Sequence, residues 1–289
     1  MFSSLVSNRG KVKTECFSIT GLRSNNEDYC VVRRLGKDSF FLAVADGMGG
    51  KEGGEIASRI ALDSVAEFLS EEFLRENNDE RLKELMAKAF LVAQTTIADY
   101  VSSYPKFRGM GTTMVAVLVC NGKYVCGSIG DSRMYLFSNF KVHQITEDHT
   151  YIQDFIKTKN EALPSAIIKR YQNVVTKIID GGSDKPDIYP VSCEKADLGD
   201  GDVILLCSDG LIPDKICDYS DFFKESISKT FSLKKTSRNL VDWALANGSE
   251  DNISVVLCSY GSKNCKSIGE AEQAEQQTIR ILPKEAKDE

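Results

Sequence analysis

Residues 14–45 consist of short apolar runs separated by clusters of turn-forming residues. The last of these runs, Phe40–Ala45, is followed by the pair Asp46-Gly47. A short apolar run bounded by turn signals is typical of a buried strand. We therefore predict strands in this region, with Asp46 directly after the last one.

Apolar residues then recur at helical spacing in two stretches. The first starts at Gly54, and the second, longer one covers Leu82–Val101. Spacings of three and four positions place side chains on one face of a helix. The pattern predicts two helices whose apolar faces pack on the core.

A dense β region follows the second predicted helix. Thr112–Cys120 and Lys123–Ile129 read as strands, and the pair Asn121-Gly122 between them is a strong signal for a two-residue hairpin. A further turn leads into the apolar segment RMYLF. Consecutive hairpins indicate antiparallel pairing and an α+β protein, and they disfavour a doubly wound parallel sheet.

The rest of the chain gives a less regular pattern. Residues 150–180 combine helix and loop features, and no internal repeat is present. We predict strands at Val203–Cys207 and Ile253–Tyr260, with a helix at Thr236–Ala246 between them. Residues 261–289 are rich in Glu, Gln, Ala and Lys, which favours a flexible tail or a marginal helix.

Composition and charge restrict the possible functions. Of 289 residues, 42% are hydrophobic and 27% are charged, as in ordinary globular proteins. A net charge of −6 disfavours binding to nucleic acid or to an anionic membrane. No apolar run approaches the roughly 20 residues that a bilayer span needs, and no signal peptide is evident. We therefore expect a cytoplasmic protein.

The nine cysteines are scattered, and no CxxC pair occurs among them. This spacing disfavours a zinc cage and a thioredoxin-like redox site. Several cysteines, such as Cys120 and Cys207, lie inside apolar runs. We interpret the cysteines as small buried apolar residues of a protein in a reducing compartment.

Three aspartates stand at the ends of predicted strands: Asp46, Asp209 and Asp251. A rigid strand end can hold such a side chain in a cleft, and Gly47 offers its carbonyl as a further oxygen ligand. Oxygen ligands without nearby His or Cys suit Mg²⁺ or Mn²⁺. Each Asp-Gly pair alone is equally typical of an ordinary turn, so the prediction rests on the set.

The segment RSNNED adds Arg23, Glu27 and Asp28. Adjacent carboxylates on a strand point in different directions, so one can reach a metal-bound water while its neighbour orients other waters. The planar guanidinium of Arg23 suits a phosphate group. Taken alone, the segment is also consistent with a solvated charged turn.

Seven motifs in order give the sequence a specific resemblance: RSNNED, VADGMGG, GMGTT, GSIGDSRMY, TEDHT, LLCSDGL and EDNISVV. From about Thr14 to Tyr260 the chain resembles the metal-dependent protein phosphatase family, called PPM or type 2C. The resemblance implies an αββα four-layer sandwich of two antiparallel sheets flanked by helix pairs. It divides the chain into an N-terminal segment (1–13), a catalytic domain (14–260) and a polar tail (261–289).

The resemblance also implies a pair of Mn²⁺ or Mg²⁺ ions. Asp46 would bridge them, and the Gly47 carbonyl would bind one. Asp209 and Asp251 would bind the second ion, and Glu27 would act through bound water. A water between the two cations would then attack phosphorus directly and expel the serine or threonine oxygen.

Other roles follow from the same resemblance. Asp28 would help to position water, and Arg23 would hold the phosphate. Asp131 matches an aspartate associated with a weaker third metal, although a residue that ends a hairpin strand reads almost equally well. His149 matches a family position that is not a ligand, and we expect a structural, hydrogen-bonded histidine there.

Met48 departs from many eukaryotic members, which carry a histidine at this position. Methionine cannot donate a proton, so the general acid is not identified by the motif and could be a metal-bound water. The motif DGMGG is that of bacterial-type members. In these members the segment after His149 forms a flap, which predicts a flap at residues 150–180 with a part in substrate preference.

The expected function is therefore hydrolysis of phosphoserine and phosphothreonine in proteins, by a monomer that opposes a Ser/Thr kinase. Two alternatives remain open: an inactive phosphatase-like binding protein, and a Mg²⁺-binding signalling module. Receiver modules are shorter and have parallel sheets, which disfavours the second alternative. A cysteine phosphatase motif (Cys followed six residues later by Arg), a GxxxxGK[ST] loop and a GxSxG elbow are all absent from the sequence.

Overall fold

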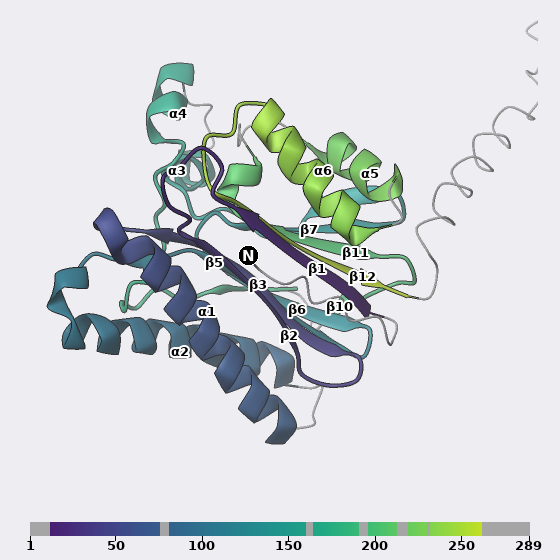
Figure 1. Cartoon of the computed structure of the whole chain (residues 1–289), viewed down its shortest axis with the longest axis horizontal. Coiled ribbons are helices and arrows are strands. Elements are labelled where there is room, and N and C mark those ends of the chain that lie inside the picture. Colours follow the sequence, from purple (N-terminus) through teal and green to yellow (C-terminus); the bar gives the residue numbers. More distant parts are fainter. Residues whose placement is uncertain are drawn as a thin grey trace, which may run out of the picture.

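Two antiparallel sheets face each other between two layers of helices in the computed structural model (Figure 1). The structure describes residues 12–75, 81–159, 164–190, 196–212, 219–229 and 232–261. The architecture is the predicted αββα sandwich of the α+β class, so the fold class is confirmed.

The larger sheet has the strand order β10-β6-β5-β3-β2, with β4 beside β3 and β9 beside β6. Its strands are β2 (Asp28–Arg34), β3 (Ser39–Met48), β4 (Gly111–Thr112), β5 (Met114–Cys120), β6 (Lys123–Ile129), β9 (Asp187–Tyr189) and β10 (Ala196–Asp197). Two long helices, α1 (Gly50–Arg75) and α2 (Leu82–Ser103), cover its outer face (Figure 1).

The smaller sheet has the order β1-β12-β11-β7-β8. Its strands are β1 (Val12–Ile19), β7 (Arg133–Ser138), β8 (Lys141–Gln144), β11 (Val203–Cys207) and β12 (Ile253–Tyr260). The helices α5 (Ser220–Lys229) and α6 (Leu233–Ala246) cover its outer face. Two short helices, α3 (Tyr151–Lys159) and α4 (Ser165–Tyr171), lie at one end of the sandwich, beside the loop from β1 to β2 (Figure 1).

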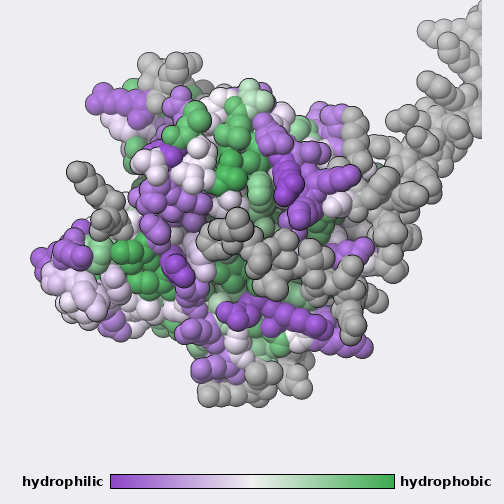
Figure 2. All heavy atoms as spheres, in the orientation of Figure 1, coloured by the Kyte–Doolittle hydropathy of each residue, from purple (hydrophilic) through white to green (hydrophobic). Residues whose placement is uncertain are grey.

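The central strands are apolar throughout because both of their faces are buried. On β3, Phe41 and Ala43 pack against the helix layer, while Phe40 and Leu42 pack in the core between the sheets. Side chains alternate between the two faces of a strand, so a strand between two apolar layers needs apolar residues at every position. On the face seen in Figure 2, hydrophilic and hydrophobic residues are interspersed.

The strand β3 is longer than its sequence predicts. It continues through Asp46 to Met48, so Asp46 lies inside the strand and the prediction that it follows the strand is wrong. Hydrogen-bonding partners on both sides extend the ladder: Asp28 of β2 lies opposite Asp46, and Thr112 of β4 lies opposite Gly47. Pairing with neighbouring strands therefore overrides the local turn signal of the Asp-Gly pair.

Two further boundaries differ from the predictions. The predicted strand Thr112–Cys120 is divided at Thr113, whose N–H donates 2.8 Å to the carbonyl of Asp46 and whose residue lies outside the regular ladder. The first helix begins at Gly50, four residues before the predicted start. The hairpin at Asn121-Gly122 is confirmed, with φ angles of 51° and 78° that suit this turn.

The cysteines follow the predicted pattern only in part. Cys120, Cys126, Cys207 and Cys258 are buried, as predicted. Cys16 of β1 and Cys30 of β2 form a disulfide between the edge strands of the two sheets, so the prediction of thiols is wrong for this pair. Three further cysteines and the predicted tail lie outside the described residues. None of the helices in the described ranges combines the length and apolarity of a membrane span.

Candidate metal centre

A cavity of about 370 Å³ collects most of the predicted site residues at one place. Seven of the eight line it: Arg23, Glu27, Asp46, Gly47, Asp131, Asp209 and Asp251. The eighth, Asp28, is buried directly beside Asp46 in the β2–β3 ladder. Residues that are more than 200 positions apart in the chain therefore meet in one cleft.

Asp28 is buried although it carries an ionisable group. Its Oδ2 accepts a hydrogen bond of 2.6 Å from Ser208, whereas its Oδ1 has no hydrogen-bond partner among the described residues. Burial raises the pKa of Asp28 to about 7, and the carboxylates of Asp209 and Asp251 add to the rise, against the lowering effect of the Ser208 and Ser254 hydroxyls. A buried acceptor without a donor is the kind of group that a cation satisfies.

Asp46 lies in the same acidic environment. Burial raises the pKa of Asp46 well above its ordinary value, and the nearby carboxylates of Asp28, Asp209 and Asp131 raise it further. Its side chain also shares a hydrogen bond with Asp209, which requires a proton on one of the two carboxyl groups. The protein alone therefore cannot keep all of these groups ionised at low cost, and divalent cations would remove this conflict.

The strands β11 and β12 bring the other two aspartates to the cleft. Asp209 begins a short 3₁₀ turn (Asp209–Leu211) after β11, and Asp251 lies two residues before β12, which pairs with β11. At Gly210 a Cβ atom would collide with the backbone carbonyl of Asn252, so the close approach of these two segments requires glycine.

A similar close contact fixes Gly47. Its N–H donates 3.1 Å to the carbonyl of Glu27, and a Cβ atom there would collide with the carbonyl of Gly54 in α1. The β3 strand end, the Glu27 segment and the start of α1 are thus packed backbone against backbone. The absence of a side chain at Gly47 makes this packing possible.

Arg23 forms an ion pair with Asp251, with 2.8 Å between Nη2 and Oδ2. Burial raises the pKa of Glu27, Arg23 lowers it, and Asp251 and Glu55 raise it further. Across the described parts of the chain, no three acidic, His or Cys side chains already surround one common point. Asp251 is engaged with Arg23 and Asp46 with Asp209, so a bound cation would replace these contacts.

Asn252 is a site residue for which the motifs predicted no role. Its Nδ2 donates 2.8 Å to the carbonyls of Thr20 and Asn25, and its Oδ1 accepts 2.8 Å from the N–H of Glu27. These bonds tie the RSNNED loop to the start of β12. The motif EDNISVV contained the signal, but the partners of Asn252 are visible only in the folded chain.

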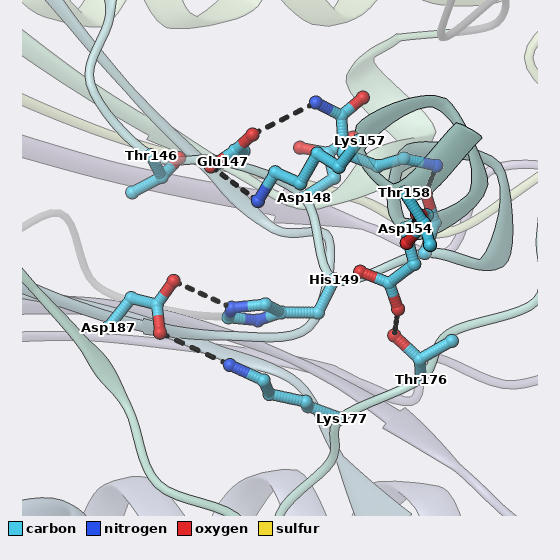
Figure 3. A network of polar contacts seen from close by, with 12 residues as sticks. Thr146, Glu147, Asp148, His149, Asp154, Lys157, Thr158, Thr176, Lys177 and Asp187 are labelled. Atoms are coloured by element: carbon cyan, nitrogen blue, oxygen red, sulfur yellow. Dashed lines mark hydrogen bonds and ion pairs between the residues drawn. The ribbon is translucent and has the colours of Figure 1, made fainter. Parts of the chain in front are cut away.

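His149 is buried and hydrogen-bonded through Nδ1, as predicted, and its Nε2 faces Asp187 (Figure 3). Its Nδ1 accepts 3.0 Å from the N–H of Gly130, and its Nε2 lies 3.1 Å from Asp187. Burial acts to raise the pKa of Asp187, but hydrogen bonds from His149 and Lys177 hold it below its ordinary value. The imidazole thus supports the turn that presents Asp131 to the cleft.

The predicted flap is attached to the sandwich through polar contacts of α3 (Figure 3). Lys157 pairs at 2.7 Å with Glu147, which precedes the predicted flap. Within the flap, Asp154 accepts 2.7 Å from the hydroxyl of Thr176. Asn173 and Val175 from this region line the cavity. As predicted, residues 150–180 are part helix and part loop.

An acidic cleft at the end of an antiparallel αββα sandwich defines a metal-binding α+β protein, and comparison with known proteins identifies its family. The model of the family "Protein phosphatase 2C" matches residues 22–246. The chain belongs to this family, and the predicted family is thereby confirmed.

Several bacterial relatives resemble the chain. PstP, a serine/threonine protein phosphatase of Mycobacterium tuberculosis (strain H37Rv), is 30% identical over 244 residues, which cover 82% of this chain and 42% of PstP. The chain thus spans less than half of that relative. The serine/threonine phosphatase stp of Listeria monocytogenes (strain EGD-e) is 28% identical over 82% of this chain and 90% of its own length. The protein phosphatase PhpP of Streptococcus pneumoniae (strain R6) is 29% identical over 84% of this chain and 95% of its own length.

Solved structures share the fold. The catalytic domain of PstP in complex with two manganese ions superposes with a TM-score of 0.71 at 28% identity, covering 87% of this chain and 99% of that one. Stp1 from Staphylococcus aureus gives a TM-score of 0.73 at 26% identity, covering 91% and 99%.

Proposed function

We propose that this chain hydrolyses phosphoserine and phosphothreonine in proteins with the help of two Mn²⁺ or Mg²⁺ ions. The observation that carries the proposal is the meeting of Asp46, Asp209 and Asp251 in one cleft. The relatives named serine/threonine phosphatases, and the two manganese ions in the PstP structure, support it.

The carboxylates of Asp46, Asp209 and Asp251 and the carbonyl of Gly47 would hold the two ions, with Glu27 acting through water. Asp131 would serve a weaker third ion. Two bound cations neutralise phosphate charge and acidify the water that they share.

The remaining site residues act on substrate and water. The exposed guanidinium of Arg23 would bind the phosphate oxygens as a planar fork. Asp28, buried beside Asp46, would orient the attacking water through its unpartnered Oδ1. Met48 lines the cavity but carries no proton to give, so the leaving oxygen receives its proton from another group.

The proposal extends to the setting of the enzyme. Residues 14–260 would form the catalytic domain of a monomer, 150–180 its flap, and phosphorylated proteins of an opposing Ser/Thr kinase its substrates. The cytoplasmic location stays a prediction, and the Cys16–Cys30 disulfide weighs against it because reducing compartments keep such pairs as thiols.

Turnover of p-nitrophenyl phosphate and of a phosphothreonine peptide tests the function. Wild type should show sustained, Mn²⁺-dependent hydrolysis that stops in a chelator. Asp46→Asn should abolish it, whereas Asp99→Asn on the exposed face of α2 should not. A wild-type rate in the Asp46 variant would refute the site. No hydrolysis by wild type would favour the phosphatase-like binding protein.

A further inference from the structure

A second cavity of about 510 Å³ adjoins the metal centre. Arg23, Asn173, Asp209 and Asp251 line both cavities, so the second one continues directly from the cleft that would hold the phosphate. A substrate chain that places its phosphoresidue on the metal centre therefore has a neighbouring hollow available for an adjacent side chain.

One wall of the second cavity is apolar. Leu22 lines it and is 74% exposed, so its apolar side chain is open to a bound ligand. The preceding Gly21 has a φ of +62°, and a Cβ atom there would collide with the carbonyl of Asp251, so the turn is packed against the site. Ile212, which is buried, contributes to the same lining.

The other relevant wall is acidic. Asp209 and Asp251 also line the cavity, but both are assigned to the metal ions. Glu250 is exposed at the cavity, and none of the ion pairs among the described residues uses it. With the cations in place, Glu250 is thus the carboxylate of this cavity that keeps an uncompensated negative charge.

The wall that carries Glu250 is held in place by its neighbours. The hydroxyl of Ser249 donates 2.6 Å to the carbonyl of Gly210, and its N–H donates 3.0 Å to the carbonyl of Ala244. On the other side of Glu250, Asn252 is fixed by the three bonds described above. A preformed wall costs little ordering on binding.

Resting on the proposed function, we propose that this cavity binds a lysine or arginine side chain that flanks the phosphorylated residue of the substrate. The aliphatic stem lies against Leu22 and Ile212, and the cationic head meets Glu250. Long basic side chains combine an apolar stem with a charged end in this way. An exposed ion pair of this kind corresponds to roughly a 1.5- to fivefold preference in kcat/KM.

Peptides provide the test. In a set of phosphothreonine peptides, each of the three positions on either side of the phosphothreonine is occupied in turn by Lys, norleucine, Ala or Glu. Wild type should prefer Lys over Ala and Ala over Glu at one of these positions. Glu250→Gln should lower the Lys-to-Ala ratio to about the norleucine-to-Ala ratio, whereas Leu22→Ser should remove the norleucine-to-Ala preference. Each preference is a ratio measured on one variant, so a general loss of activity cancels.

Glu67→Gln, on the exposed side of α1, is the matched control and should keep every ratio. An unchanged Lys-to-Ala ratio in Glu250→Gln overturns the inference. So does a wild type without any preference that still turns over p-nitrophenyl phosphate. If wild type hydrolyses neither p-nitrophenyl phosphate nor any peptide, the proposed function fails and the inference fails with it.

Discussion

Asp28 lies directly opposite Asp46 in the antiparallel pair of β2 and β3. Like charges at directly opposed positions destabilise a sheet, and here Asp28 is buried and Asp46 half-buried, with the carboxylates of Asp209 and Asp131 near Asp46. The Asp28–Asp46 pair therefore destabilises this part of the sheet when no metal is bound. Cations bound at this place would turn that cost into an attraction, which leads to the first two predictions.

Asp46→Asn should stabilise the metal-free protein. The substitution removes one charge from the cluster, and the new amide can still donate a hydrogen bond to Asp209. We expect the free energy of unfolding to rise by about 1–2 kcal/mol, which corresponds to a thermal-unfolding midpoint a few degrees higher. Thermal unfolding in a chelator measures it. Mn²⁺ should raise the midpoint of wild type but not that of the variant, and a lower midpoint of the variant in chelator would contradict the argument.

The stability of the metal-free protein should fall as the pH rises from about 4 to 7. Below the ordinary pKa of 3.8, Asp28 is protonated in both the folded and the unfolded state. Above it, the unfolded chain loses the proton while the folded chain keeps it up to a pKa of about 7. The loss is on the order of 4 kcal/mol. Urea unfolding across this pH range should show that the free energy of unfolding depends less on pH in Asp28→Asn than in wild type. An equal pH dependence in the two proteins would contradict the role of Asp28.

Arg23→Ala should weaken phosphate binding without weakening metal binding. The ion pair with Asp251 is exposed at 60% and 38% of the two side chains, so its loss costs little stability. Removing Arg23 also frees Asp251 for a cation. We expect inhibition by inorganic phosphate to weaken about tenfold, with Mn²⁺ affinity equal or tighter by calorimetry. Weaker Mn²⁺ affinity would show that Arg23 supports the ligands.

His149→Ala should lower the free energy of unfolding by about 2–4 kcal/mol. The substitution removes two polar contacts and leaves the N–H of Gly130 without its acceptor. His149→Asn places an oxygen near the position of Nδ1, so it should restore much of the loss. The free energy of unfolding in urea ranks the three proteins. If Ala and Asn variants were equally unstable, the bond to Gly130 would carry no weight.

Opening the Cys16–Cys30 disulfide should destabilise the protein by about 3 kcal/mol, given its separation of 14 residues. A reductant should lower the midpoint of wild type and leave a Cys16→Ser/Cys30→Ser double variant unchanged. Of nine cysteines, the bonded two leave at most seven to react with a thiol reagent in the unfolded, unreduced chain. Nine reactive thiols would show that the pair is open.

Much of the fold could be predicted because burial on both faces leaves a clear pattern. The strands at Val203–Cys207 and Ile253–Tyr260 have the predicted bounds, and the Asn121-Gly122 hairpin follows from local backbone preference. These features depend on residues close in sequence. The extension of β3 through Asp46 depends instead on hydrogen bonds from β2 and β4, which a turn signal cannot reveal.

The candidate site shows the same division. Motifs located the acidic residues, since the chemistry requires oxygen ligands of a recognisable kind. They could not show that Arg23 is paired with Asp251, nor that Asn252 holds the loop of Glu27. The Cys16–Cys30 bond was equally hidden, because its two cysteines belong to different sheets. Each of these contacts joins segments whose distance is set by the whole fold.

The pairing of β1 with β12 along their full length places the first and last strands of the domain side by side. During synthesis, β1 would have to wait for β12 to leave the ribosome before it could gain this neighbour. Asp251 lies just ahead of β12, so a chain that ends before Asp251 would lack both this proposed ligand and the strand that follows it. Premature termination anywhere upstream should therefore yield an inert product, and the cell would obtain catalysis only from nearly complete translation of the domain.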